Sequence, residues 1–484
     1  MNVQADIDFD VIVVGSGAGG AAVTYQLVRS GLKVLLLEKG KELPRDGSTL
    51  DVERVVRRGE FLSREPWVDG DGRAIVPEEH FNIGGKTKWY GAALLRFSAA
   101  EFTADPPFCC RSWPISLEDL LPYYEVAEKL LGVRYLAIEP DLQRIIGRVV
   151  RPGKSWRAAA MPMGLADDIL KYRLEAQHFD GFASVRGLKG EAQHSLLSKV
   201  VDDARLKLIS DAEVVGLIGS LKDTKAIVGV RLADGREFRA PRVVLAAGAL
   251  HSPRILARYL KHTELEHSLP QVAIIGRNLK LHALTAMVAF SPGLKTDVIR
   301  KTALLTNEDF PHSSVQPLGF DAELISTLMP GLLPRYIARI LADRAYGFFL
   351  QTEDGSDLRN AVLEKGSGVT AERVIDYDAT RLQATHREHQ LFTRALQRSL
   401  LSAGMLAFTR RIGLAGTAHA CGSLICGRDP ADSVVSAEGR VHGMSGIYVA
   451  DGSILPRISR VNPSLTIYAW ALRLGSSIAK EYKI

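Results

Sequence analysis

The chain has 484 residues, of which 46% are hydrophobic, with 43 glycines and 21 prolines. This composition is that of an ordinary globular protein and excludes a collagen, a disordered tail protein and a small disulfide scaffold. Length alone predicts about three domain-sized units. The 61 basic and 55 acidic residues give a net charge of +6. Because no long basic cluster is interleaved with aromatic residues, we expect no nucleic-acid partner.

Cysteine usage and hydropathy indicate where the protein works. The chain contains no CxxC pair, so we expect no zinc and no other bound metal. Its four cysteines fit a reducing compartment; they are Cys109, Cys110, Cys421 and Cys426. No segment reaches the ~18 uninterrupted apolar residues of a membrane span, and residues 1–10 lack the cationic region of a signal peptide. We therefore expect a cytoplasmic protein without a membrane span.

The first forty residues predict a dinucleotide-binding unit. Residues 10–14 form a short apolar run typical of a buried parallel strand. The turn Gly15-Ser16-Gly17-Ala18-Gly19-Gly20 follows, and a helix over 21–29 and a second strand over 33–37 complete the unit. In such a turn the first glycine permits the tight bend, the second lets the backbone approach a pyrophosphate, and the third allows close packing of helix on strand.

The acid after the second strand and the number of such turns narrow the cofactor. Glu38 is placed to accept hydrogen bonds from the ribose hydroxyls of an adenosine. The chain contains no second GxGxxG turn. Since an enzyme that uses both FAD and NAD(P)H usually has two, the single turn favours permanently bound FAD.

Two later strands also end in small residues. The run over 242–248 predicts a strand followed by a helix near Ser252. The run over 446–449 predicts another strand, ending at Asp451, whose carboxylate is suited to ribityl or ribose hydroxyls. Between them, residues 211–217 and 227–232 alternate as antiparallel strands do, and Asp234-Gly235 is typical of a hairpin turn.

A long helix is predicted over 467–480, opened by Asn462-Pro463-Ser464-Leu465-Thr466. Asn462 and Ser464 are both plausible helix caps. The positive end of this helix would stabilise negative charge on a flavin.

The stretch over 416–427 resembles the signature His-x-x-Gly-Thr-x-x-Met-Gly of the glucose–methanol–choline (GMC) family of FAD oxidoreductases. Here the signature reads His419, Gly422, Ser423, Cys426 and Gly427. Ser423 replaces the usual threonine and Cys426 the usual methionine, which we interpret as changes of packing. Further family elements match at Val449, Asp451 and Ser453, and at Asn462, Pro463 and Thr466, while residues 84–91 look like the flavin-attachment loop.

The resemblance implies an α/β fold in which a Rossmann-like three-layer FAD-binding domain is interleaved with an α+β substrate domain built on an antiparallel sheet. The FAD domain is expected to take 1–100, 190–290 and 410–484, and the substrate domain 101–189 and 291–409. The expected FAD contacts are Gly15, Gly17, Ala18, Gly20, Glu38, Lys39, Gly85, Thr87, Tyr90, Gly91, Val214, Ala247, Gly248, Asp451, Gly452, Asn462, Pro463 and Thr466.

The resemblance also implies the chemistry. His419 is expected to accept the hydroxyl proton of an alcohol while Asn462 fixes its oxygen and the flavin N5 takes the hydride. Some relatives bond covalently to the flavin through a histidine, and Trp89 stands at that place here, so we expect non-covalent FAD. His251, His282 and His442 are expected to be structural.

The substrate remains open. A sugar, glycoside or cyclitol hydroxyl is the leading expectation, and a hydrophobic alcohol, aromatic or terpenoid, is the alternative. Some relatives catalyse no net oxidation, as hydroxynitrile lyases do, or act under light on fatty acids; a scaffold with a vestigial flavin is a third class. The electron acceptor is oxygen, a quinone or a carrier. Residues 113–128 are expected to begin a lid helix, and 331–341 a covering helix or a membrane-surface patch.

Overall fold

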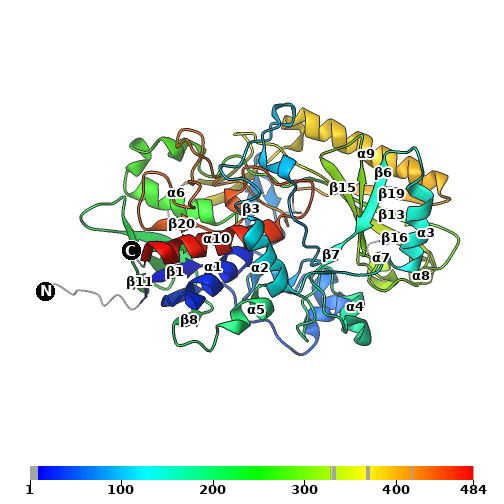
Figure 1. Cartoon of the computed structure of the whole chain (residues 1–484), viewed down its shortest axis with the longest axis horizontal. Helices are drawn as coiled ribbons and strands as arrows, with labels where there is room; N and C mark the ends of the chain where they lie inside the picture. The colour runs from blue at the N-terminus through cyan, green and yellow to red at the C-terminus, as the bar shows by residue number, and fades with distance from the viewer. Residues whose placement is uncertain are drawn as a thin grey trace.

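The computed structural model describes residues 9–327, 329, 334–366, 371–414, 416 and 418–482. Two lobes lie side by side, and both ends of the described chain belong to the same one (Figure 1). The chain passes from the first lobe to the second and back twice, because strand β6 (Trp156–Ala160) of the second lobe precedes β8 to β12 (206–245) of the first, and β13 to β19 (283–411) of the second lobe come before the final return.

The first lobe is centred on a five-stranded sheet in which all neighbouring strands are parallel. Four of its strands are buried along their whole length, which is why they read as continuous apolar runs. In spatial order the strands are β20 (Ile447–Val449), β12 (Val243–Leu245), β1 (Val11–Val14), β2 (Val34–Leu37) and β8 (Leu206–Ile209).

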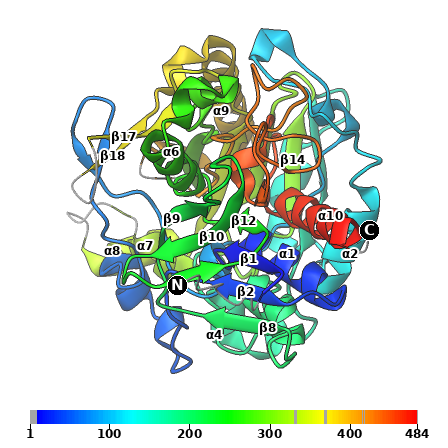
Figure 2. The same ribbon diagram turned by 90° about the vertical axis from the view of Figure 1, so that its left-hand side faces the viewer.

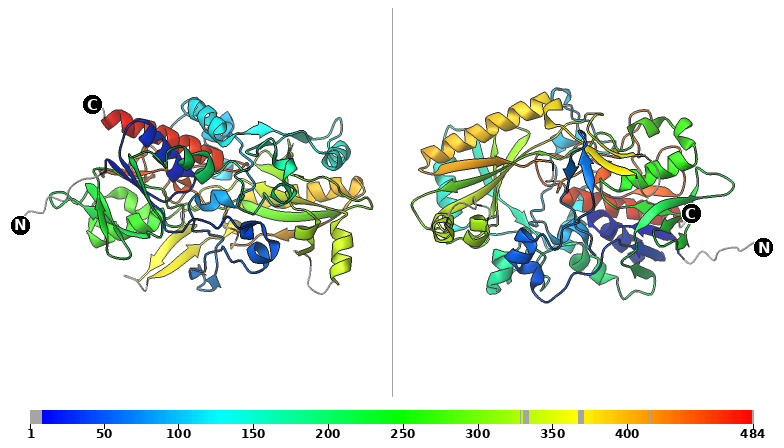
Figure 3. Two further views of the ribbon diagram at one scale, coloured as in Figure 1. Left: turned by 90° about the horizontal axis from the view of Figure 1, so that it is seen from below. Right: turned by 180° about the vertical axis from the view of Figure 1, so that it is seen from behind.

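Further layers flank this sheet (Figure 3). Helices α1 (Ala18–Arg29) and α10 (Ser464–Tyr482) pack side by side on one face. Toward the other lie α6 (Ser252–His262) and an antiparallel sheet of β9 (Val214–Gly219), β10 (Ile227–Leu232) and β11 (Glu237–Arg239). The predicted three-layer α/β fold is confirmed, and the expected hairpin turn joins β10 to β11 with Gly235 at φ +88°.

The second lobe is a six-stranded antiparallel sheet, as expected for the substrate side. Its strands, in spatial order, are β19 (Leu406–Arg411), β13 (Ala283–Phe290), β16 (Ala345–Thr352), β15 (Ser313–Pro317), β14 (Ala303–Asn307) and β6 (Trp156–Ala160). Helices α3 (Pro140–Val149) and α9 (Gln383–Ser402) pack on one face in a shared apolar core. The division at residue 290 stays a prediction, but β13 pairs along its length with β16 in this sheet.

Smaller elements surround the two main sheets, and β17 and β18 are labelled at the left of Figure 2. A four-stranded sheet contains β17 (Ala361–Lys365), β18 (Glu372–Asp376), β3 (Trp67–Asp69) and β4 (Ala74–Ile75), and a two-stranded one β5 (Arg134–Tyr135) and β7 (Pro162–Met163). The short helices are α4 (Arg173–Gln177), α5 (Ala192–Ser195), α7 (Ala322–Thr327) and α8 (Arg335–Ala342). In the described ranges, no helix has both the length and the apolar character needed to cross a membrane.

Two segments were expected to cover the substrate side of the molecule, and the structure places them as follows. The helix predicted near 113–128 is α2 (Leu121–Leu131); it packs against α10, where the Tyr124 hydroxyl bonds Thr466 Oγ1 at 2.6 Å. No residue of α2 lines the cavity between the lobes, so the prediction that this helix is a lid is wrong. The apolar side of α2 packs against α10 instead. Of the segment 331–341, residues 331–333 lie outside the described residues, and α8 packs on α7.

Candidate functional site

A cavity of about 480 Å³ lies between the lobes. One wall is formed by the carboxyl ends of the parallel strands, and the other by the open face of the six-stranded sheet. The alternation of side chains along a strand explains the second wall. In β16, Phe348 and Leu350 belong to the core under α9, whereas Phe349 between them lines the cavity together with its cross-strand partner Gln316.

Nearly all of the predicted cofactor residues line this cavity; the exceptions are Gly20 and Thr466. Thr466 is fully buried and bonded to Tyr124 of α2. Gly20 lies in the first turn of α1, where the absence of a side chain allows the helix to pack against Gly15. The structure thus brings together segments from the start, middle and end of the chain, although the contact of each residue with FAD stays a prediction.

The glycine turn fits a pyrophosphate. Gly15 has φ +98°, and a Cβ there would lie 2.5 Å from the carbonyl oxygen of Ala246. A Cβ at Gly20 would lie 1.8 Å from the Gly15 oxygen. Gly17 differs, because a Cβ there meets nothing within 4 Å and the residue lines the cavity. Gly17 therefore leaves open space for a phosphate group at the N-terminus of α1.

Glu38 holds this turn from the end of β2. One of its oxygens accepts hydrogen bonds from Ser16 N at 2.9 Å and Ser16 Oγ at 2.6 Å, and the other from Gly40 N at 2.8 Å. Burial raises the pKa of Glu38, although these hydrogen bonds oppose the shift. Its carboxylate remains on the cavity wall, where the predicted ribose contact would form.

Asp451, just after the end of β20, likewise holds neighbouring turns through hydrogen bonds to its carboxylate. It accepts hydrogen bonds from Gly248 N at 2.8 Å, Ser252 Oγ at 2.5 Å and Ser453 N at 2.9 Å. Burial raises the pKa of Asp451, and these donors oppose that shift. The carboxylate therefore ties the end of β20 to the turn that begins α6, and the joined turns form one wall of the cavity.

The expected flavin loop lies against the glycine turn. A Cβ at Gly85 would be 3.2 Å from the Gly17 Cα. Thr87 Oγ1 donates to Gly84 O at 2.6 Å, and the Tyr90 hydroxyl donates to Gly190 O at 2.5 Å. Trp89, at the place of a covalent histidine in some relatives, donates to Asn82 Oδ1 at 2.9 Å and stacks on the ring of His80.

The two predicted catalytic residues line the same cavity. Asn462 Nδ2 donates to Ala93 O at 3.2 Å, and its amide exchanges two hydrogen bonds, of 3.0 and 3.2 Å, with the amide of Gln316. His419 Nδ1 lies 3.2 Å from Nδ1 of His282. Burial holds the pKa of His419 well below its usual value, and nearby His282, Lys301 and Lys86 act in the same direction. The ring is therefore neutral at neutral pH, as a general base requires.

Several cavity residues escaped the sequence analysis. Lys301 Nζ lies 2.7 Å from Asp180 Oδ2, and a Cβ on Gly91 would lie within 2.5 Å of both side chains. Gln316 is the fourth residue of β15. No motif marks these residues; side-chain alternation along β15 could have revealed Gln316, whereas Lys301 and Asp180 lie outside the strands and carry no periodic signal. His251, expected to be structural, lines the cavity and bonds Glu79 at 2.8 Å.

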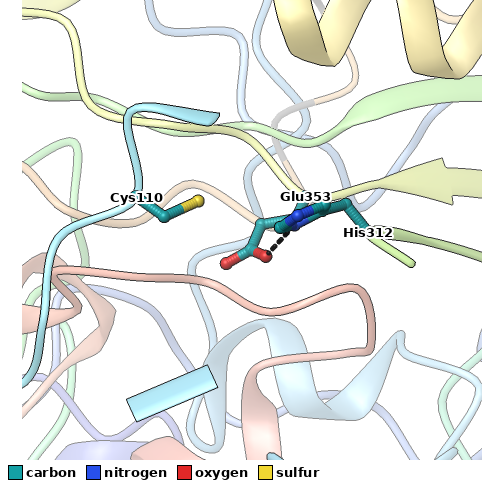
Figure 4. Close-up of side chains that lie close together, drawn as sticks. All are labelled: Cys110, His312 and Glu353. Atoms are coloured by element: carbon teal, nitrogen blue, oxygen red, sulfur yellow. Dashed lines mark hydrogen bonds and ion pairs between the residues drawn. The ribbon is translucent and has the colours of Figure 1, made fainter. Parts of the chain in front are cut away.

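Outside the cavity, Cys110, His312 and Glu353 converge from three segments (Figure 4). The two ring nitrogens of His312 bond Glu353 at 2.9 Å and Asp105 at 3.1 Å. Arg457 adds two hydrogen bonds of 2.6 and 2.9 Å to Glu353. Burial raises the pKa of the Cys110 thiol. His312 and Glu353 thus bond each other, Glu353 also bonds Arg457, and the Cys110 thiol keeps its proton. We therefore interpret the cluster as a buried ion network.

Comparison with known proteins agrees with this geometry. Domain models described as GMC oxidoreductase match residues 111–284 and 355–471, and an NAD(P)-binding Rossmann-like domain matches residues 13–49. The 6'''-hydroxyparomomycin C oxidase of Streptomyces lividus is 29% identical, over 99% of this chain and 92% of that protein. Paromamine 6'-oxidase of Streptomyces fradiae is 27% identical, over 98% and 92%.

Two further similarities extend over nearly the whole chain. The 2-methyl-1,2-propanediol dehydrogenase of Mycolicibacterium austroafricanum is 23% identical, over 100% of this chain and 97% of that protein. The crystal structure of pyridoxine 4-oxidase from Mesorbium loti superposes with a TM-score of 0.63 at 19% identity, covering 98% of this chain and 99% of that one. At that identity the structural likeness concerns the fold.

The contrast between Gly17 and Gly20 gives a matched test of the cofactor site. Gly17→Ala places a methyl group in open cavity space, so we expect the protein to fold normally and its FAD affinity to fall by at least about tenfold. Gly20→Ala forces backbone apart, and we expect a stability loss of roughly 1–3 kcal/mol or more. Thermal unfolding of the FAD-free variants and titration with FAD measure the two effects; wild-type FAD affinity in Gly17→Ala would contradict the assignment.

Proposed function

Because this chain belongs to the GMC oxidoreductase family, whose members bind FAD and act on alcohols, we propose that it oxidises a hydroxyl group of a sugar, glycoside or cyclitol to the carbonyl. The observation that carries the proposal is a neutral histidine on the wall of a cavity that also contains the glycine turn. A base and a cofactor site in one cavity are the two requirements of the reaction.

In this proposal the chain's own residues handle the proton and the orientation. His419 accepts the hydroxyl proton at Nε2, since its Nδ1 is occupied by His282 and no side chain among the described residues bonds its Nε2. Asn462 is held by Gln316 and by the carbonyl of Ala93, and it orients the substrate oxygen by exchanging one of these two long N–H bonds for a bond to the substrate. Bound FAD supplies the acceptor for the hydride that leaves the carbon atom.

The chemistry of the cavity wall favours a polyhydroxylated substrate over an apolar one. Lys301, Asp180 and Gln316 line the cavity near the Gly91–Ala93 segment on which Asn462 rests. Although Lys301 bonds Asp180 and Gln316 bonds Asn462, charged and amide groups of this kind can form further hydrogen bonds, which hydroxyls would satisfy and an aromatic or terpenoid alcohol would not. The similarity to two oxidases named for paromomycin-type compounds points the same way.

An anaerobic substrate screen tests the reaction. We expect methyl glycosides, amino sugars or cyclitols to bleach the flavin band in stopped flow, and benzyl and long-chain alcohols to do so weakly. His419→Ala should lower the rate constant of flavin reduction by about a hundredfold or more while retaining FAD, because the base is lost.

His442→Ala is the matched control, since His442 bonds Ser433 and is absent from the cavity wall; it should reduce at the wild-type rate. Turnover without bleaching would favour a lyase, and bleaching only under illumination a light-driven enzyme. Subsequent addition of air, a quinone or a dye identifies the acceptor. A wild-type rate in His419→Ala would exclude His419 as the base.

The lowered pKa of His419 predicts the pH dependence of reduction. A histidine with an ordinary pKa near 6.5 would lose base activity as the pH falls through that value. Since the pKa of His419 lies well below 6.5, its neutral form persists to lower pH. We therefore expect the rate constant of flavin reduction to stay constant from about pH 8 to about pH 6; a halving of that rate constant near pH 6.5 would contradict this.

We also propose that FAD is held without a covalent bond, because Trp89 has no nucleophilic ring nitrogen to offer and its indole N–H is bonded to Asn82. Precipitation of the purified protein with acid should therefore release all of the yellow flavin into the supernatant. A yellow pellet after washing would show a covalent link at another residue.

A further inference from the structure

His282 makes the one hydrogen bond to His419 that the described part of the chain contains. The two rings meet edge to face, with centroids 5.1 Å apart and planes at 75°. His282 immediately precedes β13, is only 4% exposed, and has φ +62°. Positive φ is uncommon for a residue other than glycine and persists only where the surroundings enforce it, often at functional sites.

The partners of His282 determine where the protons lie. Its Nε2 is 2.8 Å from the carbonyl oxygen of Ser459. A carbonyl only accepts, so Nε2 of His282 carries a hydrogen. Burial lowers the pKa of His282 to about 4, against the opposing effect of the Ser459 carbonyl, so the ring is neutral and its Nδ1 carries none. Nδ1 of His282 must then accept a hydrogen bond from Nδ1–H of His419.

We propose that His282 is a positioning residue, which holds His419 in the tautomer protonated at Nδ1 and so leaves the bare Nε2 of His419 to take the substrate's hydroxyl proton. A neutral imidazole has one proton to place, and the wrong tautomer cannot act as the base. The proposal rests on the proposed function of His419 and adds a second histidine to it.

The Ser459 carbonyl that orients His282 is itself tightly held. Ser459 has φ +66°, and its backbone N donates to Glu353 Oε1 at 3.2 Å. Its hydroxyl donates to Glu101, which also accepts Arg460 N at 3.0 Å. Two buried carboxylates therefore fix the turn in an otherwise unfavourable conformation.

This gives the buried ion network a role. Glu353 accepts hydrogen bonds from Arg457 and Ser459 N and is bonded to His312, the contact drawn in Figure 4, and these partners fix its charge and orientation. Three residues after Ser459 the same turn reaches Asn462. The turn over residues 459–462 thus sets the tautomer of His419 through its hydrogen bond to His282. The same turn places Asn462 beside Gln316.

The tautomer can be measured without any substrate. Wild-type, FAD-loaded enzyme containing ¹⁵N-labelled histidine, at about pH 8, reports the protonation of each ring nitrogen by NMR. The His419 signals are identified by their loss in His419→Ala. We expect His419 to be protonated at Nδ1 and His282 at Nε2; a His419 ring protonated at Nε2 would overturn the proposal. Because this readout needs no turnover, it stands apart from failure of the substrate screen.

Variants of His282 test the consequence for reduction. His282→Ala removes the acceptor, and we expect the rate constant of flavin reduction at saturating substrate to fall by about tenfold or more, with substrate Kd and FAD content little changed. His282→Asn keeps an acceptor oxygen near the Nδ1 position and tolerates positive φ, so it should recover to within about fivefold of wild type.

His389→Asn is the matched control. His389 is also a buried histidine at the same sheet, bonded to Thr285 and Thr352. Its replacement should leave reduction at the wild-type rate. Equal rates in His282→Ala and wild type, or equal losses in His282→Ala and His389→Asn, would assign His282 a purely structural role.

Discussion

Backbone contact at the carboxyl ends of three strands is the constraint on which the rest of the structure depends. A Cβ on Gly15, Gly19 or Gly20 would lie 2.5, 2.1 or 1.8 Å from a backbone oxygen of Ala246, Ala450 or Gly15. The first turn of the chain can therefore meet the ends of β12 and β20 only as glycine. This contact closes the first lobe around strands from opposite ends of the chain, and it opens the cavity at Gly17.

Buried carboxylates then fix the loops that surround the cavity. Glu38, Asp451 and Glu353 are each at most 6% exposed, and each accepts hydrogen bonds from backbone N–H groups. Such bonds satisfy donors that would be costly to bury alone, and they hold loops more precisely than apolar contact does. The first two carboxylates hold the turns on the cavity wall around Gly17, and the third holds the turn that leads to Asn462, so hydrogen bonds of the same kind order both parts of the cavity.

Sequence patterns predicted a helix, strand or turn well where short-range chemistry alone determines that element. Buried parallel strands are continuous apolar runs, and the glycine turn, the hairpin at Gly235 and the start of α10 carry their own signals. The helix at α2 was also anticipated, but its position was not. An apolar stripe shows that a helix is covered on one side, whereas its packing partner, here α10, is decided by the whole fold.

By itself, the sequence determined the family, the α/β fold and FAD as the cofactor, and it predicted the FAD site around the glycine turn and the two residues expected to act on the alcohol. Only the tertiary structure decided which side chains support them. His282 and His419, Gln316 and Asn462, and Asp180 and Lys301 are bonded pairs separated by 137, 146 and 121 residues of sequence. Such pairs are brought together by sheet register and by turns held at positive φ. Neither feature produces a periodic pattern in the sequence.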